Sequence, residues 1–112
     1  MTIKCSKEDK FCIVAINGDL DASSAVLLDN EVRSLINDDE KHIFIDCNEL
    51  NYVASAGLGV FMSYIQDIKT KNINFRLFNL SEKILDVFKI LGLDVLMTID
   101  NTKEDVLNSI SE

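Results

Sequence analysis

The chain has 112 residues, 47% of them hydrophobic, and a formal net charge of −8 from 11 basic and 19 acidic residues. This length and composition predict one domain, residues 1–112, with a sizeable core. The acidic balance disfavours nucleic-acid binding, which depends on clustered Lys and Arg. No apolar run approaches the roughly 18 to 20 residues of a membrane span and no signal peptide is apparent, so we expect a cytoplasmic protein that does not insert into membranes.

The first elements predicted along the chain are two strands and a helix. Residues 2–6 and 11–17 have strand character, and the four polar residues between them suit an antiparallel hairpin. The segment Gly-Asp-Leu-Asp at 18–21 then interrupts the strand pattern. Apolar residues at helical spacing predict a helix over 23–37, with Asp21 or Ser23 as its N-cap.

Strands and helices alternate through the rest of the chain. Strands are predicted at 42–47, 73–80 and 95–99. Helices are predicted from Ser55 or Ala56 to residue 71, from Ser81 to residue 91, where Gly92 suits a left-handed cap, and after Thr102, which begins a capping box. The alternation predicts an α/β fold. We expect a mixed, mostly parallel sheet of about five strands, with an N-terminal antiparallel hairpin at or near one edge, and about four helices.

The most informative segment is 51–61, Asn-Tyr-Val-Ala-Ser-Ala-Gly-Leu-Gly-Val-Phe, which follows the strand at 42–47. A buried strand gives way here to an amphipathic helix, so Ser55 lies at a strand-to-helix junction where a partner or an enzyme can recognise its hydroxyl. The same position suits an ordinary N-cap serine that satisfies one backbone amide. Capping and modification are compatible, because a hydroxyl at the start of a helix can be exposed.

Four separated segments resemble, in order and spacing, the STAS domain of bacterial anti-sigma factor antagonists. The segment Ile-Asn-Gly-Asp-Leu-Asp at 16–21 resembles the family's strand that ends in G-[ED]-L-D, and 42–50 resembles its central strand. The segment Ala-Ser-Ala-Gly-Leu-Gly at 54–59 resembles its phosphoacceptor motif D-S-[ST]-G-L-G. The segment 80–93 resembles the part that carries the family's third helix. The resemblance spans nearly the whole chain, implies the STAS fold and places Ser55 at the phosphoacceptor position.

The resemblance implies a regulatory binding protein, not an enzyme, in a partner-switching cascade that controls transcription. It would bind an anti-sigma factor that is also a serine kinase and so release a sigma factor. Phosphorylation of Ser55 would end that binding. A serine phosphatase would be a further partner, and we expect no cofactor, no metal and a monomer or weak dimer. The residues that would form or flank the docking face are Asp19, Asp21, Ala54, Ser55, Ala56, Gly57, Leu58 and Val60.

Several residues of this segment also have structural interpretations. Ala54 stands where the family usually has Asp, whose carboxylate would orient the hydroxyl or contact the kinase. Gly57 and Gly59 either let the helix pack closely on the sheet or leave bare backbone for a partner to approach. Val60 and Tyr64 lie one turn apart and form either a small exposed apolar patch or a contact beneath a neighbouring helix.

Two other classes of function stay open. A STAS subunit of an ABC-type lipid or solute transporter would dock an ATPase through the same face, without phosphoserine. A nucleotide-binding or sensory STAS module is disfavoured, because no G-K-[ST] follows the glycines and basic residues are scarce near the site. Cys5, Cys12 and Cys47 lack metal-ligand spacing and are interpreted as reduced core thiols. The single histidine, His42, cannot provide a His-rich metal site or a catalytic dyad.

Overall fold

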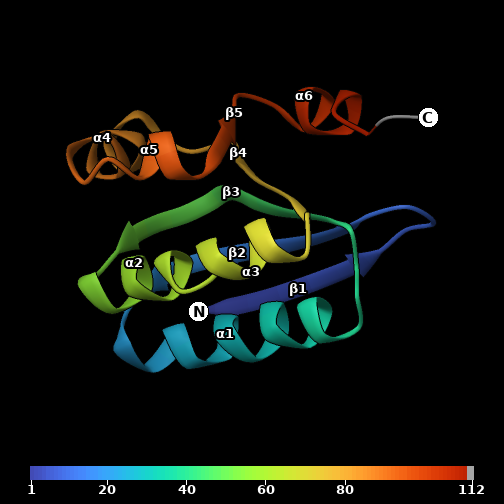
Figure 1. Ribbon diagram of the computed structural model, residues 1–112. Helices are drawn as coiled ribbons and strands as arrows, with labels where there is room; N and C mark the ends of the chain where they lie inside the picture. The colour runs from blue at the N-terminus through green and yellow to red at the C-terminus, as the bar shows by residue number, and fades with distance from the viewer. Residues whose placement is uncertain (111–112) are drawn as a thin grey trace.

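A computed structural model describes residues 1–110 and contains a five-stranded mixed sheet (Figure 1). In chain order the elements are β1 (Thr2–Lys7), β2 (Cys12–Leu20), α1 (Ala22–Asn37), β3 (His42–Val53), α2 (Ser55–Met62), α3 (Ile65–Thr70), β4 (Asn74–Phe78), α4 (Glu82–Ile90), α5 (Leu93–Leu96), β5 (Thr98–Asp100) and α6 (Lys103–Asn108). The strands are ordered β1-β2-β3-β4-β5; β1 pairs antiparallel with β2, and the other neighbours are parallel. The predicted fold class, with an N-terminal hairpin at one edge, is confirmed.

The sheet has a core on each face. Side chains of α1 to α5 pack with one face of the sheet, and α6 packs on the other, where Val106 meets Phe44 and Phe78. Figure 1 shows α6 on the opposite side of the strands from α1. Because successive side chains of a strand point to opposite faces, Phe44 belongs to one core while Ile43 and Ile45 belong to the other. The central strand β3 is therefore apolar at each of the three positions 43–45.

The strands β2 and β3 are longer than the sequence predicts. The two stay paired in parallel as far as Leu20 and Val53, so the segments 18–20 and 48–53, which we expected to be loops, are strand. Their register shifts between Ala15 and Asn17 and again after Gly18, whose φ is +112°. Such irregularities disturb the two-residue alternation by which a strand is recognised in a sequence.

The helix predicted up to residue 71 is broken into α2 and α3 at Ser63 and Tyr64. The Ser63 hydroxyl donates to the Val60 carbonyl at 2.6 Å. The buried Tyr64 points to α1, where its hydroxyl donates to the Asp29 carboxylate at 2.9 Å and the Arg33 guanidinium lies 5.0 Å from its ring centroid. Tyr64 thus packs beneath a neighbouring helix, as one of our two interpretations proposed, and Val60 is half-buried.

The strand predicted at 95–99 is wrong over its first half. Gly92 adopts the predicted left-handed conformation, with φ +73°, after α4, but the chain then forms the short helix α5 before β5. Leu93 is buried, whereas Val95 and Leu96 are exposed. A short apolar run does not distinguish a strand from a helix. With α3 and α5 counted, residues 1–110 contain six helices, more than the four predicted.

Candidate functional site

The carboxyl ends of β2 and β3 lie side by side and lead directly into α1 and α2. Leu20 is paired with Val53, and the backbone N–H of Ala54 donates to the Leu20 carbonyl at 2.9 Å. The residues that follow these strands, Asp21 and Ala54, are the N-caps of two helices at the same edge of the sheet, and Ser55 is the first helical residue of α2. The structure brings the two predicted segments of the site together.

The start of α1 is closed by a capping box. The Asp21 carboxylate accepts hydrogen bonds from the backbone N–H of Ser23 and Ser24 at 3.1 and 3.0 Å, and from both serine hydroxyls. In return, the Ser24 hydroxyl oxygen accepts from the Asp21 N–H at 2.8 Å. These bonds, the Ser24 amide above all, lower the pKa of Asp21 to about 2. Of the two predicted N-caps, Asp21 is the one used, and Ser23 is not.

The start of α2 has no side-chain cap. Its N-cap residue is Ala54, Ser55 is the first helical residue, and the first turn contains no acidic residue. Ser55 is exposed, and its hydroxyl makes no hydrogen bond with residues 1–110. The interpretation of Ser55 as an ordinary N-cap serine is therefore wrong. First-turn amides and the positive end of the helix dipole favour a negative charge at this position.

The two glycines of α2 have different surroundings. A Cβ added to Gly57 would lie 2.8 Å from the Leu20 side chain and 3.1 Å from its carbonyl oxygen, so Gly57 permits α2 to pack on the end of β2. A Cβ added to Gly59 would meet nothing within 4 Å, and Gly59 is exposed. Close packing explains Gly57 only, and nothing in residues 1–110 requires a glycine at Gly59.

The remaining docking candidates divide between the surface and the core. Asp19 and Ala56 are exposed and Ala54 is half-buried, whereas Leu58 is buried beneath α2. Tyr52, which the sequence analysis did not propose for the docking face, is paired with Asp19 in the sheet and is 53% exposed. Its exposure beside Asp19 was not predicted, because residues 51–53 were expected to be a loop and not the end of a strand.

The other candidate groups do not form a reactive site. Cys12 and Cys47 are buried as predicted, and burial raises the pKa of the Cys12 thiol to about 11. Cys5 is exposed on β1, so its assignment to the core was wrong. His42 is half-buried, with its Nδ1 3.0 Å from the side-chain nitrogen of Asn74. Residues 1–110 contain no cluster of three or more His, Cys, Asp or Glu able to hold a metal ion, and no helix in that range is long and apolar enough to cross a bilayer.

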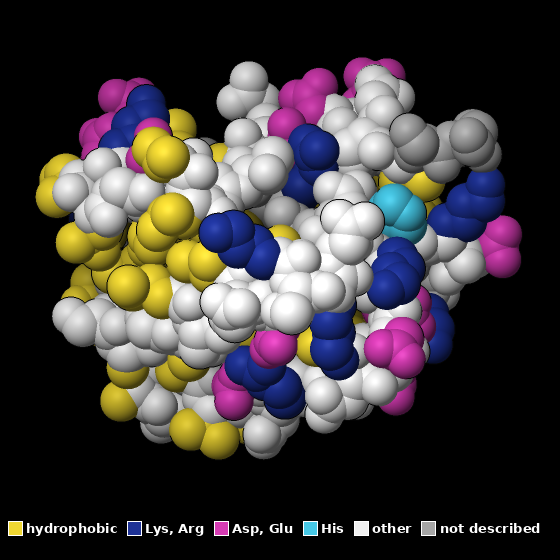
Figure 2. Space-filling model, viewed as in Figure 1, with side chains coloured by type: hydrophobic (Ala, Val, Ile, Leu, Met, Phe, Trp, Pro, Cys, Tyr) yellow, Lys and Arg dark blue, Asp and Glu magenta, His cyan; other side chains and the backbone are white. Residues whose placement is uncertain are grey.

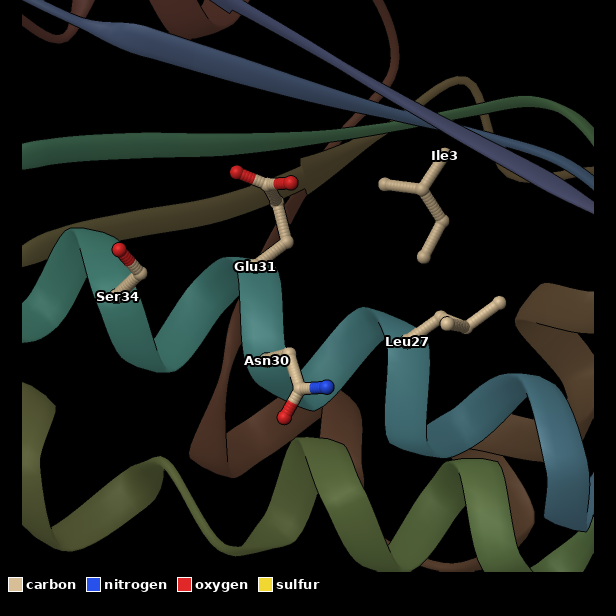
Figure 3. Close-up of a pocket in the computed structure, with 5 residues that line it drawn as sticks. All are labelled: Ile3, Leu27, Asn30, Glu31 and Ser34. Carbon is tan, nitrogen blue, oxygen red and sulfur yellow. The ribbon is translucent and has the colours of Figure 1, made fainter.

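A hollow of about 440 Å³ lies between β1 and α1 (Figure 3). Figure 3 shows the Ile3 side chain extending from β1 toward α1, and the Glu31 carboxylate pointing toward the sheet. The other lining residues are Leu27, Asn30 and Ser34. One carboxylate without a cation or a second acid to work with carries no evident chemistry, so the edge that holds Ser55 remains the candidate site.

Comparison with known proteins adds family evidence to this geometry. The family model of the STAS domain matches residues 2–106. The anti-sigma-B factor antagonist of Staphylococcus aureus (strain NCTC 8325 / PS 47) is 25% identical over 104 residues, which cover 93% of this chain and 96% of that protein.

Two solved structures share the fold. An anti-sigma factor antagonist from Mycobacterium paratuberculosis superposes with a TM-score of 0.88 at 18% identity, covering 99% of this chain and 94% of that one. The Bacillus cell fate determinant SpoIIAA, in its phosphorylated form, superposes with a TM-score of 0.76 at 17% identity, covering 98% of this chain and 100% of that one.

Proposed function

This chain belongs to the STAS domain family, and from that premise we propose that it is an anti-sigma factor antagonist switched off by phosphorylation of Ser55. It binds, in the cytoplasm, an anti-sigma factor that is also a serine kinase, and it thereby frees a sigma factor; it is a substrate, not a catalyst. The observation that carries the proposal is the exposed, unbonded hydroxyl of Ser55 at an uncapped helix start. Its relative in Staphylococcus aureus is an anti-sigma-B factor antagonist, and SpoIIAA exists in a phosphorylated form.

A phosphate on Ser55 is compatible with the fold. The group adds about −1.5 to −2 charges at neutral pH. Its oxygens can accept hydrogen bonds from the first-turn amides of α2, which no side chain occupies, and the helix dipole stabilises negative charge there. The modified protein therefore stays folded without rearranging its sheet.

The same phosphate opposes a partner packed over the start of α2. The surface around Ser55 contains the small exposed residues Ala56 and Gly59, which allow close approach. A phosphoryl group adds bulk to that surface, must lose its hydration on contact, and joins the negative charge of Asp19 and Asp21. Release of the partner then requires no large conformational change.

The proposal is tested by incubating the protein with its candidate serine kinase and ATP, followed by mass spectrometry of the Ser55 peptide. A pull-down then compares the wild type with Ser55→Ala and Ser55→Asp. We expect the alanine variant to bind the anti-sigma factor and the aspartate variant to bind it less well. Ser34→Asp, at an exposed position on α1, is the matched control and should bind like the wild type.

Two outcomes would contradict the proposal. Equal binding of Ser55→Ala and Ser55→Asp would show that charge at this position is not the switch. Recovery of a membrane-bound transporter ATPase without an anti-sigma factor, and without phosphoserine, would instead support the transporter-subunit alternative.

A further inference from the structure

Large hydrophobic side chains are exposed on the outer surface of α2, α4 and α5. Figure 2 shows hydrophobic side chains gathered over these helices, on the left of the view. Ile90 and Val95 are 82% and 83% exposed. Contiguous exposed apolar surface of this kind marks an interaction site. We call this surface the α4–α5 patch, and it consists of Met62, Ile90, Leu91, Val95 and Leu96.

Packing within the chain does not require these residues to be apolar. The inner side of α4 and α5 is filled by Ile84, Phe88 and Leu93, which are buried. The Phe88 ring lies 5.7 Å, centroid to centroid, from the Phe61 ring, which fixes α4 against α2. Ile90 and Val95 project from the other side of these helices, so polar residues there would serve the fold equally well.

A small recess is lined by residues that are close in sequence to the patch and to the candidate site. It lies between the end of β3 and α4, has a volume of about 80 Å³, and is lined by Asn51, Tyr52, Val53, Lys83, Ile84 and Val87. Val53 stands two residues before Ser55, and Val87 is one helical turn before Ile90 and Leu91. A water occupies about 30 Å³ and a cavity that holds benzene about 150 Å³, so the recess suits one branched aliphatic side chain.

We propose that the partner that docks at Ser55 also covers the α4–α5 patch. Its contacting surface is apolar, inserts one aliphatic side chain into the recess, and carries Lys or Arg opposite the exposed Asp19 and Asp21. This inference rests on the proposed function, because it identifies the occupant as the anti-sigma factor. The surface around Ser55 offers small or charged residues, whereas the binding energy of an interface is concentrated in large, well-buried side chains. The patch supplies such side chains beside the switch.

Size and charge favour this partner over a second copy of the chain. A stable interface uses roughly 20 to 30 residues from each side, and the patch has five. Two copies would also bring together net charges of −8 each, which repel. A partner that spans both the patch and the Ser55 surface, with basic residues opposite Asp19 and Asp21, satisfies both requirements.

The experiment compares the affinity of the anti-sigma factor for wild type and for Ile90→Ser/Val95→Ser. Both positions are highly exposed, so the double variant should unfold like the wild type. We expect its affinity to fall by at least about tenfold, mainly through faster dissociation. The matched control is Val26→Ser/Leu27→Ser, which removes exposed apolar side chains of α1 (59% and 53% exposed). It should bind within about twofold of the wild type.

The possible results separate this inference from the proposed function. If the patch variant binds like the wild type while Ser55→Asp does not, the inference is wrong and the proposed function stands. If the wild type binds no anti-sigma factor, the proposed function fails and takes the inference with it. If sedimentation shows a wild-type dimer that Ile90→Ser/Val95→Ser dissociates, a second copy covers the patch and the inference is overturned.

Discussion

The starts of α1 and α2 adjoin at one edge of the sheet, yet they are built in opposite ways. At α1, the Asp21 carboxylate and the Ser24 hydroxyl close the helix start with a capping box. At α2, Ala54 offers no cap, and Ser55 stands exposed on the first turn. One helix start is thus already occupied by a negative charge, and the other is free to receive one. A phosphate on Ser55 can accept hydrogen bonds from the first-turn backbone amides of α2, because no capping side chain already binds them.

The largest effect is expected where α2 packs on the end of β2. Gly57→Ala should lower the free energy of unfolding by about 1–3 kcal/mol, because its new Cβ would lie 2.8 Å from the buried Leu20 side chain. Urea unfolding of the variant and the wild type measures the difference. An unchanged unfolding free energy would mean that α2 can move away from β2 without cost, and would contradict the close packing at Gly57.

A side-chain cap introduced at the start of α2 should make it resemble the start of α1 and stabilise the protein. Ala54→Asp should raise the free energy of unfolding by about 1 kcal/mol, because an N-cap carboxylate accepts hydrogen bonds from first-turn amides. Thermal unfolding near neutral pH provides the measurement. Ala54→Val, which cannot cap, is the control and should give no gain. Stabilisation by valine equal to that by aspartate would argue against an open start at α2.

At Gly59 we expect a smaller change in the free energy of unfolding, and one opposite in sign to that of Gly57→Ala. Gly59→Ala should stabilise the protein by about 0.5–1 kcal/mol, because alanine is the better helix former and its Cβ meets nothing within 4 Å. The same variant, titrated with the anti-sigma factor, shows whether a partner needs the bare backbone. Lower stability in urea unfolding would reveal a packing role for Gly59 and contradict the difference between the two glycines.

The smallest expected effect concerns the pH dependence of stability. The folded pKa of Asp21 is about 2, below the value near 4 of an unperturbed Asp. The ionised cap therefore contributes its full stability above about pH 4, and this is lost as the pH falls toward about 2. Asp21→Asn keeps a capping oxygen but does not titrate, so its unfolding free energy should fall less over that interval. Parallel stability curves for Asp21→Asn and wild type would contradict the role of Asp21 as a charged cap.

Sequence patterns predicted the architecture well and its irregular parts poorly. The apolar run Ile43-Phe44-Ile45 and the alternation of strands and helices identified the sheet, because burial on both faces leaves a plain signal. The continuation of β3 to Val53 was hidden by register shifts in its pairing with β2. Because β3 extends to Val53, Ala54 is the N-cap of α2. The sequence alone did not show which residue would be the N-cap.

Tertiary contacts account for the other differences. Tyr64 interrupts the second predicted helix because its ring and hydroxyl find partners on α1, at Asp29 and Arg33. Val95 and Leu96 suggested a strand, yet they lie exposed on α5. Exposed apolar residues do not follow the periodicity of residues that face a core. Secondary structure assigned from hydrophobic periodicity is therefore wrong at such positions.

The most direct test of the account is the affinity of purified anti-sigma factor for Ser55-phosphorylated and unphosphorylated protein, measured side by side. We predict that phosphorylation weakens binding by at least about tenfold, and that the backbone amide NMR spectrum changes only around the start of α2. Equal affinities for the two forms would contradict the account, and so would spectral changes spread across the whole sheet.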